Sequence, residues 1–238
     1  MGRTMAPGVI NYEALVNGDS YCQLGPTVLS PPQSLAALST LTIGGSLGAV
    51  SGAGRIFSLL SPGTTEWRAA WVLSLAARSG KAYFEVVQNS TYPAGQDIAI
   101  GLMAQSAWNT GFGGYYPPNP LSAGFYGMAS GTVGGSLTGT ISNGSLTANA
   151  AYNVSAGDNW GVAIDFGAFK MWYRQNGGSW VLGDPVAGTN PSVSFTSGAF
   201  DPYVSFYQLG SATQTLTCNF KNTDWAYPAP TGYSQLPY

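Results

Sequence analysis

The stretch GDNWGVAIDFGAFKMWYRQNG, residues 157–177, contains the pattern that decides the fold. In its first half Val162, Ile164 and Phe166 fall on one side of an extended chain, and small or acidic residues alternate with them. This period of two is typical of a half-buried strand. The following run repeats the pattern and ends in Asn176-Gly177, a pair that tolerates the positive φ of a tight hairpin turn. The stretch predicts two paired strands with a third to follow.

The same stretch resembles a strand pair of the SPRY family, in which a Gly-Val-Ala-aliphatic-Asp strand precedes an aliphatic-Trp-aromatic strand ending in Asn-Gly. Here these strands are Gly161 to Asp165 and Met171 to Gly177. Other landmarks of the family follow in the right order: GKAYFEV at 80–86, IAIG at 98–101, GDP at 183–185, YVSFY at 203–207, NF at 219–220, WAY at 225–227 and PTGY at 230–233.

The resemblance covers roughly residues 39–238 and is greatest for the Gly-, Ser- and Thr-rich SPRY-like domains of tailed-bacteriophage structural proteins. It implies a concanavalin A-like, two-sheet antiparallel β-sandwich that acts by binding. The residues indicate the same class, because short β candidates alternate with Gly, Ser, Asn and Pro clusters and helical patterns are scarce. From the alternation we expect these residues in the core: Phe84, Val86, Ile98, Ile100, Val162, Ile164, Phe166, Val204 and Phe206.

Residues 1–38 differ in composition from the rest of the chain. Their short apolar patches are interrupted by four prolines: Pro7, Pro26, Pro31 and Pro32. Proline removes backbone donors and favours extended geometry, so we expect an extended N-terminal arm that lies along the sandwich or a neighbouring subunit. A partly disordered terminus is the alternative. From the arm interpretation we predict that deleting residues 1–38 leaves the sandwich, residues 39–238, folded but abolishes its incorporation into particles.

Only 8% of the 238 residues are charged, whereas about 25% is usual in a soluble domain. A surface with so little charge gives weak protection against self-association, so we expect a homo-oligomer or a place in an assembly. The eight Lys and Arg residues form no run, which disfavours a nucleic-acid partner. The apolar run 69–77 is too short to cross a bilayer and predicts a buried strand, so no membrane insertion is expected.

The sequence contains few of the residue patterns that enzymes use for catalysis. It has no histidine, which excludes a Ser-His-Asp triad and the common zinc sites, and no paired carboxylates suited to glycoside hydrolysis. We expect no catalytic residue, no metal and no cofactor. Glu85 and Asp165, the acids inside firm strands, are expected to accept hydrogen bonds from loop backbone or to pair with an arginine. Cys218 is expected as a small buried side chain, and its pairing with Cys22 is left open.

One segment suggests a contact surface. Aromatic residues gather around Pro117, Pro118 and Pro120, and these prolines exclude the segment from a central strand. We therefore predict a contact loop with six candidate residues: Trp108, Phe112, Tyr115, Tyr116, Phe125 and Tyr126. The alternative places three of these rings in the core: Trp108, Phe125 and Tyr126.

These observations predict a non-enzymatic structural protein of a tailed phage virion, assembled in the host cytoplasm and displayed on the particle as capsid decoration or as part of a tail fibre. Its expected partners are other virion subunits of the capsid or tail. One alternative is a lectin-like module whose aromatic loop binds a host surface glycan. Another is an intracellular SPRY adaptor for a peptide partner.

Overall fold

The structure of the protein is a computed structural model. It describes the following residues: 38–39, 48–51, 55–59, 66–72, 79–90, 96–104, 122–129, 136–142, 145–150, 155–195, 200–208 and 213–236. The chain divides into two units, residues 1–34 and 35–238, and every described residue belongs to the second. The predicted arm, apart from Leu38, lies outside the described residues.

One antiparallel sheet has seven strands in the order β1-β4-β13-β6-β7-β8-β9. Their bounds are β1 (Leu38–Ser39), β4 (Glu66–Val72), β13 (Phe200–Gln208), β6 (Gln96–Ala104), β7 (Ser122–Ala129), β8 (Ser136–Ser142) and β9 (Ser145–Ala150). The strand predicted over 69–77 is confirmed as far as Val72, within β4, and residues 73–77 lie outside the described ranges.

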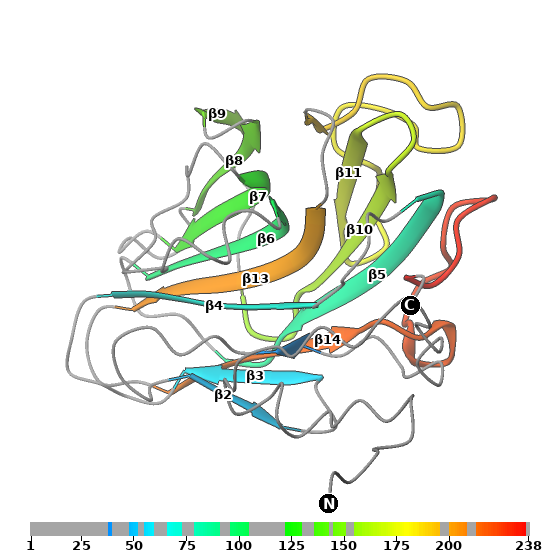
Figure 1. Ribbon diagram of the computed structural model, residues 1–238. Helices are drawn as coiled ribbons and strands as arrows, with labels where there is room; N and C mark the ends of the chain where they lie inside the picture. Colours follow the sequence, from blue (N-terminus) through cyan, green and yellow to red (C-terminus); the bar gives the residue numbers. More distant parts are fainter. Residues whose placement is uncertain are drawn as a thin grey trace, which may run out of the picture. The chain divides into compact units, whose positions relative to one another are not determined.

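The second antiparallel sheet also has seven strands, in the order β12-β11-β10-β5-β14-β3-β2. Their bounds are β12 (Val193–Ser194), β11 (Lys170–Gln175), β10 (Asn159–Asp165), β5 (Lys81–Gln88), β14 (Gln214–Asn219), β3 (Ile56–Leu59) and β2 (Gly48–Ser51). Within the described ranges the one helix is a single 3₁₀ turn, η2 (Asn222–Asp224). The protein is an all-β, two-sheet antiparallel sandwich, as predicted (Figure 1).

The core lies between the two sheets. Ile98, Ile100 and Val204 of the first sheet belong to the same buried cluster as residues of the second sheet. Eight of the nine residues predicted for the core are 6% exposed or less: Phe84, Val86, Ile98, Ile100, Val162, Ile164, Phe166 and Val204. The ninth, Phe206, lies in β13, and its side chain is outside what the structure describes. Burial of these apolar side chains is the main stabilising contribution to the sandwich.

The prediction that the strand around Val162 is half-buried is wrong. Residues Asn159 to Ile164 of β10 are buried on both faces. A second cluster covers the outer face of this sheet and contains Tyr83, Ala163, Trp172 and Tyr233, with Trp180, Trp225 and Ala229 packed against it. Figure 1 shows the C-terminal segment lying beside β5. The outer face is buried because residues 225–236, far away in sequence, fold back over it.

Two turns connect the strands of this sheet as local chemistry requires. Between β10 and β11 the Asp165 carboxylate accepts hydrogen bonds from the backbone N–H groups of Gly167 and Ala168, at 3.0 and 2.9 Å. After β11, Asn176 and Gly177 adopt the expected positive φ angles of 50° and 68°. The tight hairpin predicted there is wrong, because residues 176–192 intervene before β12 pairs with the opposite end of β11. We call residues 176–192 the β11–β12 loop.

Candidate functional site

The β11–β12 loop is closed by its own backbone. Asp184 and Thr189 exchange two backbone hydrogen bonds, of 3.2 and 3.1 Å, and the Asp184 carboxylate accepts a third from the Val186 N–H at 2.8 Å. A Cβ atom on Gly183 would collide with the carbonyl oxygens of Thr189 and Asn190, so this close approach requires glycine. The sequence Gly-Asp-Pro therefore lies in a compact turn that the hydrogen bonds of Asp184 close.

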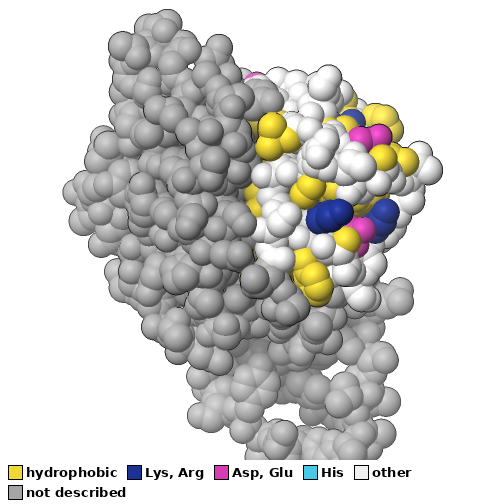
Figure 2. All heavy atoms as spheres, turned by 90° about the horizontal axis from the view of Figure 1, so that it is seen from above, with side chains coloured by type: hydrophobic (Ala, Val, Ile, Leu, Met, Phe, Trp, Pro, Cys, Tyr) yellow, Lys and Arg dark blue, Asp and Glu magenta, His cyan; other side chains and the backbone are white. Residues whose placement is uncertain are grey.

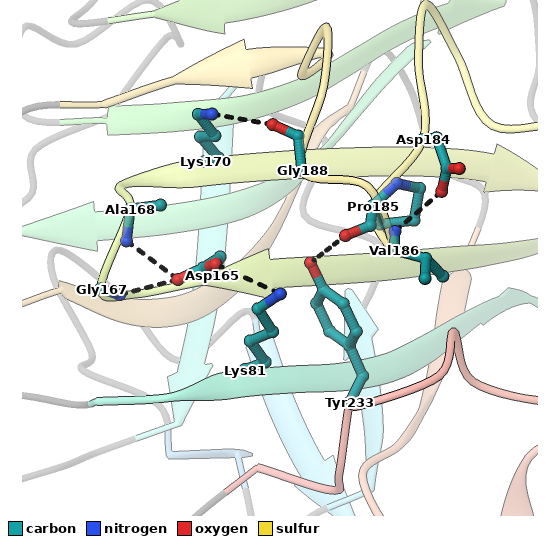
Figure 3. A network of polar contacts seen from close by, with 10 residues as sticks. All are labelled: Lys81, Asp165, Gly167, Ala168, Lys170, Asp184, Pro185, Val186, Gly188 and Tyr233. Carbon is teal, nitrogen blue, oxygen red and sulfur yellow. Dashed lines mark hydrogen bonds and ion pairs between the residues drawn. The ribbon is translucent and has the colours of Figure 1, made fainter.

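Side chains from three other positions donate hydrogen bonds to this loop, and Figure 3 shows two of them, Lys170 and Tyr233. The Lys170 ammonium donates to the Gly188 carbonyl oxygen at 2.8 Å, and the Trp172 indole N–H donates to that of Thr189 at 3.0 Å. The Tyr233 hydroxyl donates to the Pro185 carbonyl oxygen at 3.1 Å. Two donors belong to β11 and the third belongs to the C-terminal segment. The loop is therefore bound both to the sheet and to the segment that covers its outer face.

The supporting tyrosine is itself positioned by charged neighbours. The Lys81 ammonium lies 5.4 Å from the centre of the Tyr233 ring and 3.7 Å from a carboxylate oxygen of Asp165. Burial raises the pKa of the Tyr233 phenol well above its ordinary value, and the nearby carboxylates of Asp165 and Asp184 raise it further. Tyr233 therefore stays a neutral hydrogen-bond donor at physiological pH.

This rigid loop carries two aliphatic side chains into solvent. Leu182 is 59% exposed and Val186 is 51% exposed, and they are the exposed large hydrophobic residues among the side chains that the structure describes. On the face seen in Figure 2, hydrophobic side chains appear in several separate places on the described surface, between uncharged atoms and a few charged side chains. Leu182 also has a φ of 70°, a conformation that is uncommon for a residue with a branched side chain. The β11–β12 loop is thus a preformed surface feature with an apolar tip.

The buried acid beneath the outer face has a structural role. The Glu85 carboxylate accepts hydrogen bonds from the Ala226 and Tyr227 N–H groups at 2.8 and 2.9 Å. It also accepts one from the Asn159 amide at 2.7 Å and one from the Tyr83 hydroxyl at 2.9 Å. Glu85 therefore fastens the C-terminal segment to β5, and the expectation that Glu85 and Asp165 bind loop backbone is confirmed for both.

Arg174 completes this buried network. Its guanidinium donates to the Tyr83 hydroxyl at 3.1 Å and to the Pro228 carbonyl oxygen, and lies 4.5 Å from the centre of the Trp180 ring. The phenol thus joins a buried cation to a buried anion, although the two charges do not touch. Burial raises the pKa of Tyr83 well above its ordinary value. The polar groups of Glu85, Tyr83 and Arg174 are thus bound to one another and to the C-terminal segment.

Other kinds of site find little support among the described residues. In that part of the chain no group of three or more His, Cys, Asp or Glu side chains could hold a metal ion. Cys218 is a free thiol, fully buried in the core as expected, while Cys22 lies outside the described residues. No helix within the described ranges is long and apolar enough to span a bilayer.

Of the six residues of the predicted contact loop, two lie in a described strand and four lie outside the described residues. Trp108, Phe112, Tyr115 and Tyr116 lie outside the described residues. Phe125 and Tyr126 belong to β7, paired with Ile100 and Ala99 of β6, so the loop does not extend to Tyr126 as predicted. The three prolines precede β7, which explains the error: they limit where the strand begins and say nothing about residues 122–129.

The exposed tip of the β11–β12 loop was missed by sequence reasoning. Gly183-Asp184-Pro185 stood out only as a family landmark, although the apolar residues Val181, Leu182 and Val186 surround this turn signal. Apolar residues on both sides of a Gly-Asp-Pro turn are the pattern that could have indicated a surface contact, because a turn of this kind lies at the surface.

Comparison with known proteins finds fold likeness only. No family model and no curated protein sequence matches the chain. Among solved structures, the SPRY domain of human HERC1 aligns with a TM-score of 0.46 and 12% identity, over 73% of this chain and 92% of that one. A sialidase aligns with a TM-score of 0.42 and 9% identity, over 76% of this chain and 16% of the sialidase chain. The fold assignment rests on the strand order and pairing described above.

Proposed function

We propose that this protein is a non-enzymatic binding protein that uses the β11–β12 loop as a contact surface. The observation that carries the proposal is the combination of a loop held by hydrogen bonds from three side chains with two aliphatic side chains exposed at its tip. A rigid loop loses little conformational entropy on binding, and exposed aliphatic side chains supply the apolar area that drives association.

The proposal of a non-enzymatic role is supported by where the acids lie. Glu85 is fully buried and has four donors, and Asp165 caps a turn and pairs with Lys81. A carboxylate used in this way is poorly placed for proton transfer to a substrate. The chain has no histidine to take over that function.

The setting we propose for this binding is the virion of a tailed phage, where the chain would be displayed as capsid decoration or as part of a tail fibre. The charged fraction of 8%, the expected extended arm and the resemblance to SPRY-like domains of tailed-phage proteins support this setting. Its partners there are other capsid or tail subunits, and the chain is present in several copies per particle.

A quantitative gel of purified virions from the phage that encodes the chain tests this function. We expect the chain to remain with washed particles, in many copies if it decorates the capsid and in few copies if it belongs to a tail fibre. A chain that is absent from washed particles and is recovered only from the soluble host lysate contradicts the virion role. Its recovery there in complex with a host protein favours the intracellular adaptor.

A further inference from the structure

Two glutamines are buried at one end of the second sheet. Gln88 is the last residue of β5, Gln214 is the first residue of β14, and both are 0% exposed. The pairing register places Gln88 opposite Leu216, so Gln214 lies two residues from that position on the adjacent strand. Long side chains at such diagonal positions are within reach of each other.

Both glutamine side chains face the core between the sheets. Successive residues of a strand alternate between the two faces of a sheet, so Gln214 shares a face with Leu216, and Gln88 shares one with Val86. Leu216 and Val86 both belong to the buried apolar cluster between the sheets. The two amides therefore lie at the end of this cluster, where β5 ends and β14 begins.

Three of the four polar atoms of these amides lack a hydrogen-bond partner among the described residues: Gln88 Oε1, Gln214 Oε1 and Gln214 Nε2. The fourth atom, Gln88 Nε2, donates to the Ser90 carbonyl oxygen at 3.3 Å. A buried amide without partners is strongly destabilising, and native proteins rarely contain one. Because two oxygens and an NH₂ group need partners, the partner must both donate and accept hydrogen bonds.

The backbone groups around the two amides already have partners. The Thr215 N–H donates to the Ser90 hydroxyl oxygen at 3.0 Å, and the Asn89 N–H donates to the Thr215 carbonyl oxygen at 3.0 Å. The N–H and the carbonyl oxygen of Gln88 bond to residues 157–158 at 2.9 and 2.7 Å. These bonds also tie the end of β5 to the start of β14, so the two amides are held next to each other.

We propose that Gln88 and Gln214 bind ordered water in the interior of the sandwich, and that this water bridges their amides. Water can donate and accept hydrogen bonds at the same time, as the two oxygens and the NH₂ group require. Neither amide carries a charge, so an ion bound here would gain no countercharge from them. Both side chains are completely enclosed, which favours the smallest molecule that can make these bonds. This inference goes beyond the proposed function and does not depend on it.

Methionine substitutions test whether the two amides share a partner. Gln88→Met or Gln214→Met alone leaves the other amide with fewer partners, so each change is expected to lower the melting temperature by about 2–8 °C. The double variant removes both amides, so its melting temperature should return to within about 2 °C of the wild type. Gln235→Met, a change at a partly exposed glutamine, is the control and should have little effect.

Two further measurements detect the water itself in the purified protein. Oxygen-17 magnetic relaxation dispersion, which counts long-lived internal water, should find fewer such molecules in the double variant than in the wild type and an unchanged number in Gln235→Met. In the wild type, the NH₂ group of Gln214 should show a nuclear Overhauser effect to water. This second measurement needs no variant to fold.

The water bridge is overturned by any of three results. Equal numbers of long-lived water molecules in the wild type and the double variant would show that none is bound by these amides. Additive changes in melting temperature would show that the two amides have no common partner. A direct hydrogen bond between the amides, or from either amide to another group of the chain, seen in a crystal structure of the protein, would leave no role for water.

Discussion

The Tyr83 hydroxyl lies directly over Gly161, so close that a Cβ atom at this glycine would be 2.6 Å from the phenol oxygen. Gly161 is in β10 and faces the outer side of the sheet, where the phenol links Glu85 to Arg174. The missing side chain at position 161 is what leaves room for this link. The glycine of the Gly-Val-Ala motif is thus explained by a contact across the sheet, without any special backbone angle.

Replacing Gly161 with Ala should therefore destabilise the protein. The phenol cannot move aside cheaply, because it is buried and bonded on two sides, so we expect a loss of about 1–3 kcal/mol in the free energy of unfolding. Urea denaturation measures this loss. The control is Gly167→Ala, where the new Cβ makes an ordinary 3.4 Å contact in an exposed turn and should change stability by less than about 0.5 kcal/mol.

A double variant shows whether the phenol oxygen is the cause. If the clash is with the hydroxyl, Gly161→Ala should cost less in a Tyr83→Phe background than in the wild type, and the two changes will not add. Strict additivity would show that the destabilisation at position 161 comes from another contact.

The Glu85→Gln variant should loosen the C-terminal segment. An amide has only one oxygen, so in either orientation its NH₂ group faces N–H or hydroxyl donors that the carboxylate accepts in the native protein. We expect a loss of about 3 kcal/mol and faster amide hydrogen exchange at Ala226 and Tyr227. Denaturation and exchange measured by NMR give the two readings.

Asp165→Asn is the matched control for Glu85→Gln. Its remaining oxygen can still accept the turn N–H groups, and it loses only a partly exposed pair with Lys81, worth less than about 1 kcal/mol. The fastening role of Glu85 fails if its variant is no less stable than this control and the two amides exchange at wild-type rates.

Local pattern was enough to predict the inner half of the sandwich. Alternation placed Val162, Ile164 and Phe166 in the core, and the positive φ angles of Asn176 and Gly177 follow from residue type alone. The roles of Glu85 and Asp165 were also predictable, because a lone carboxylate in a strand needs donors nearby.

The outer face could not be predicted in this way. An alternating pattern shows which residues lie on the same face of the sheet. It does not show whether a segment distant in sequence covers that face. Gly161 and Ala163 are equally compatible with solvent and with a close contact. The contact at Gly161 comes from Tyr83 of β5, and residues 225–236 contribute to the cluster that contains Ala163. Leu182 was missed for the opposite reason: hydrophobicity predicts burial, whereas its exposure results from how the loop is anchored.

The contact function of the aromatic residues Phe112, Tyr115 and Tyr116 remains a prediction. Changing Phe112, Tyr115 and Tyr116 together to Ser should weaken particle attachment or adsorption to host cells while barely altering the melting temperature, because these rings are expected at the surface. Adsorption assays and thermal denaturation measure the two effects. Unfolding of the variant, with about 3–5 kcal/mol lost for each buried ring, would place the rings in the core instead.

Alkaline pH should destabilise the protein in two steps, first as the thiol and then as the phenols ionise in the unfolded chain. Burial raises the pKa of the Cys218 thiol well above its usual range near about 8.5, and burial likewise raises the pKa of Tyr83 above about 10. Below the unfolded-state pKa both states hold the proton and the full stability is present. Above it only the unfolded state releases the proton, so stability falls as pH rises, by at most about 1.4 kcal/mol per pH unit for each group.

The window between about pH 8 and 9 isolates the thiol from the phenols, because unfolded cysteine ionises there while unfolded tyrosine keeps most of its protons. Cys218→Ala removes the buried thiol and should make stability nearly independent of pH in this window, at the expense of a small cavity between Leu216 and Phe220 that lowers stability equally at every pH. Urea denaturation at several pH values measures the slopes. Equal slopes for the variant and the wild type would mean that Cys218 ionises as readily in the folded protein as in the unfolded chain, which its complete burial in the core does not allow.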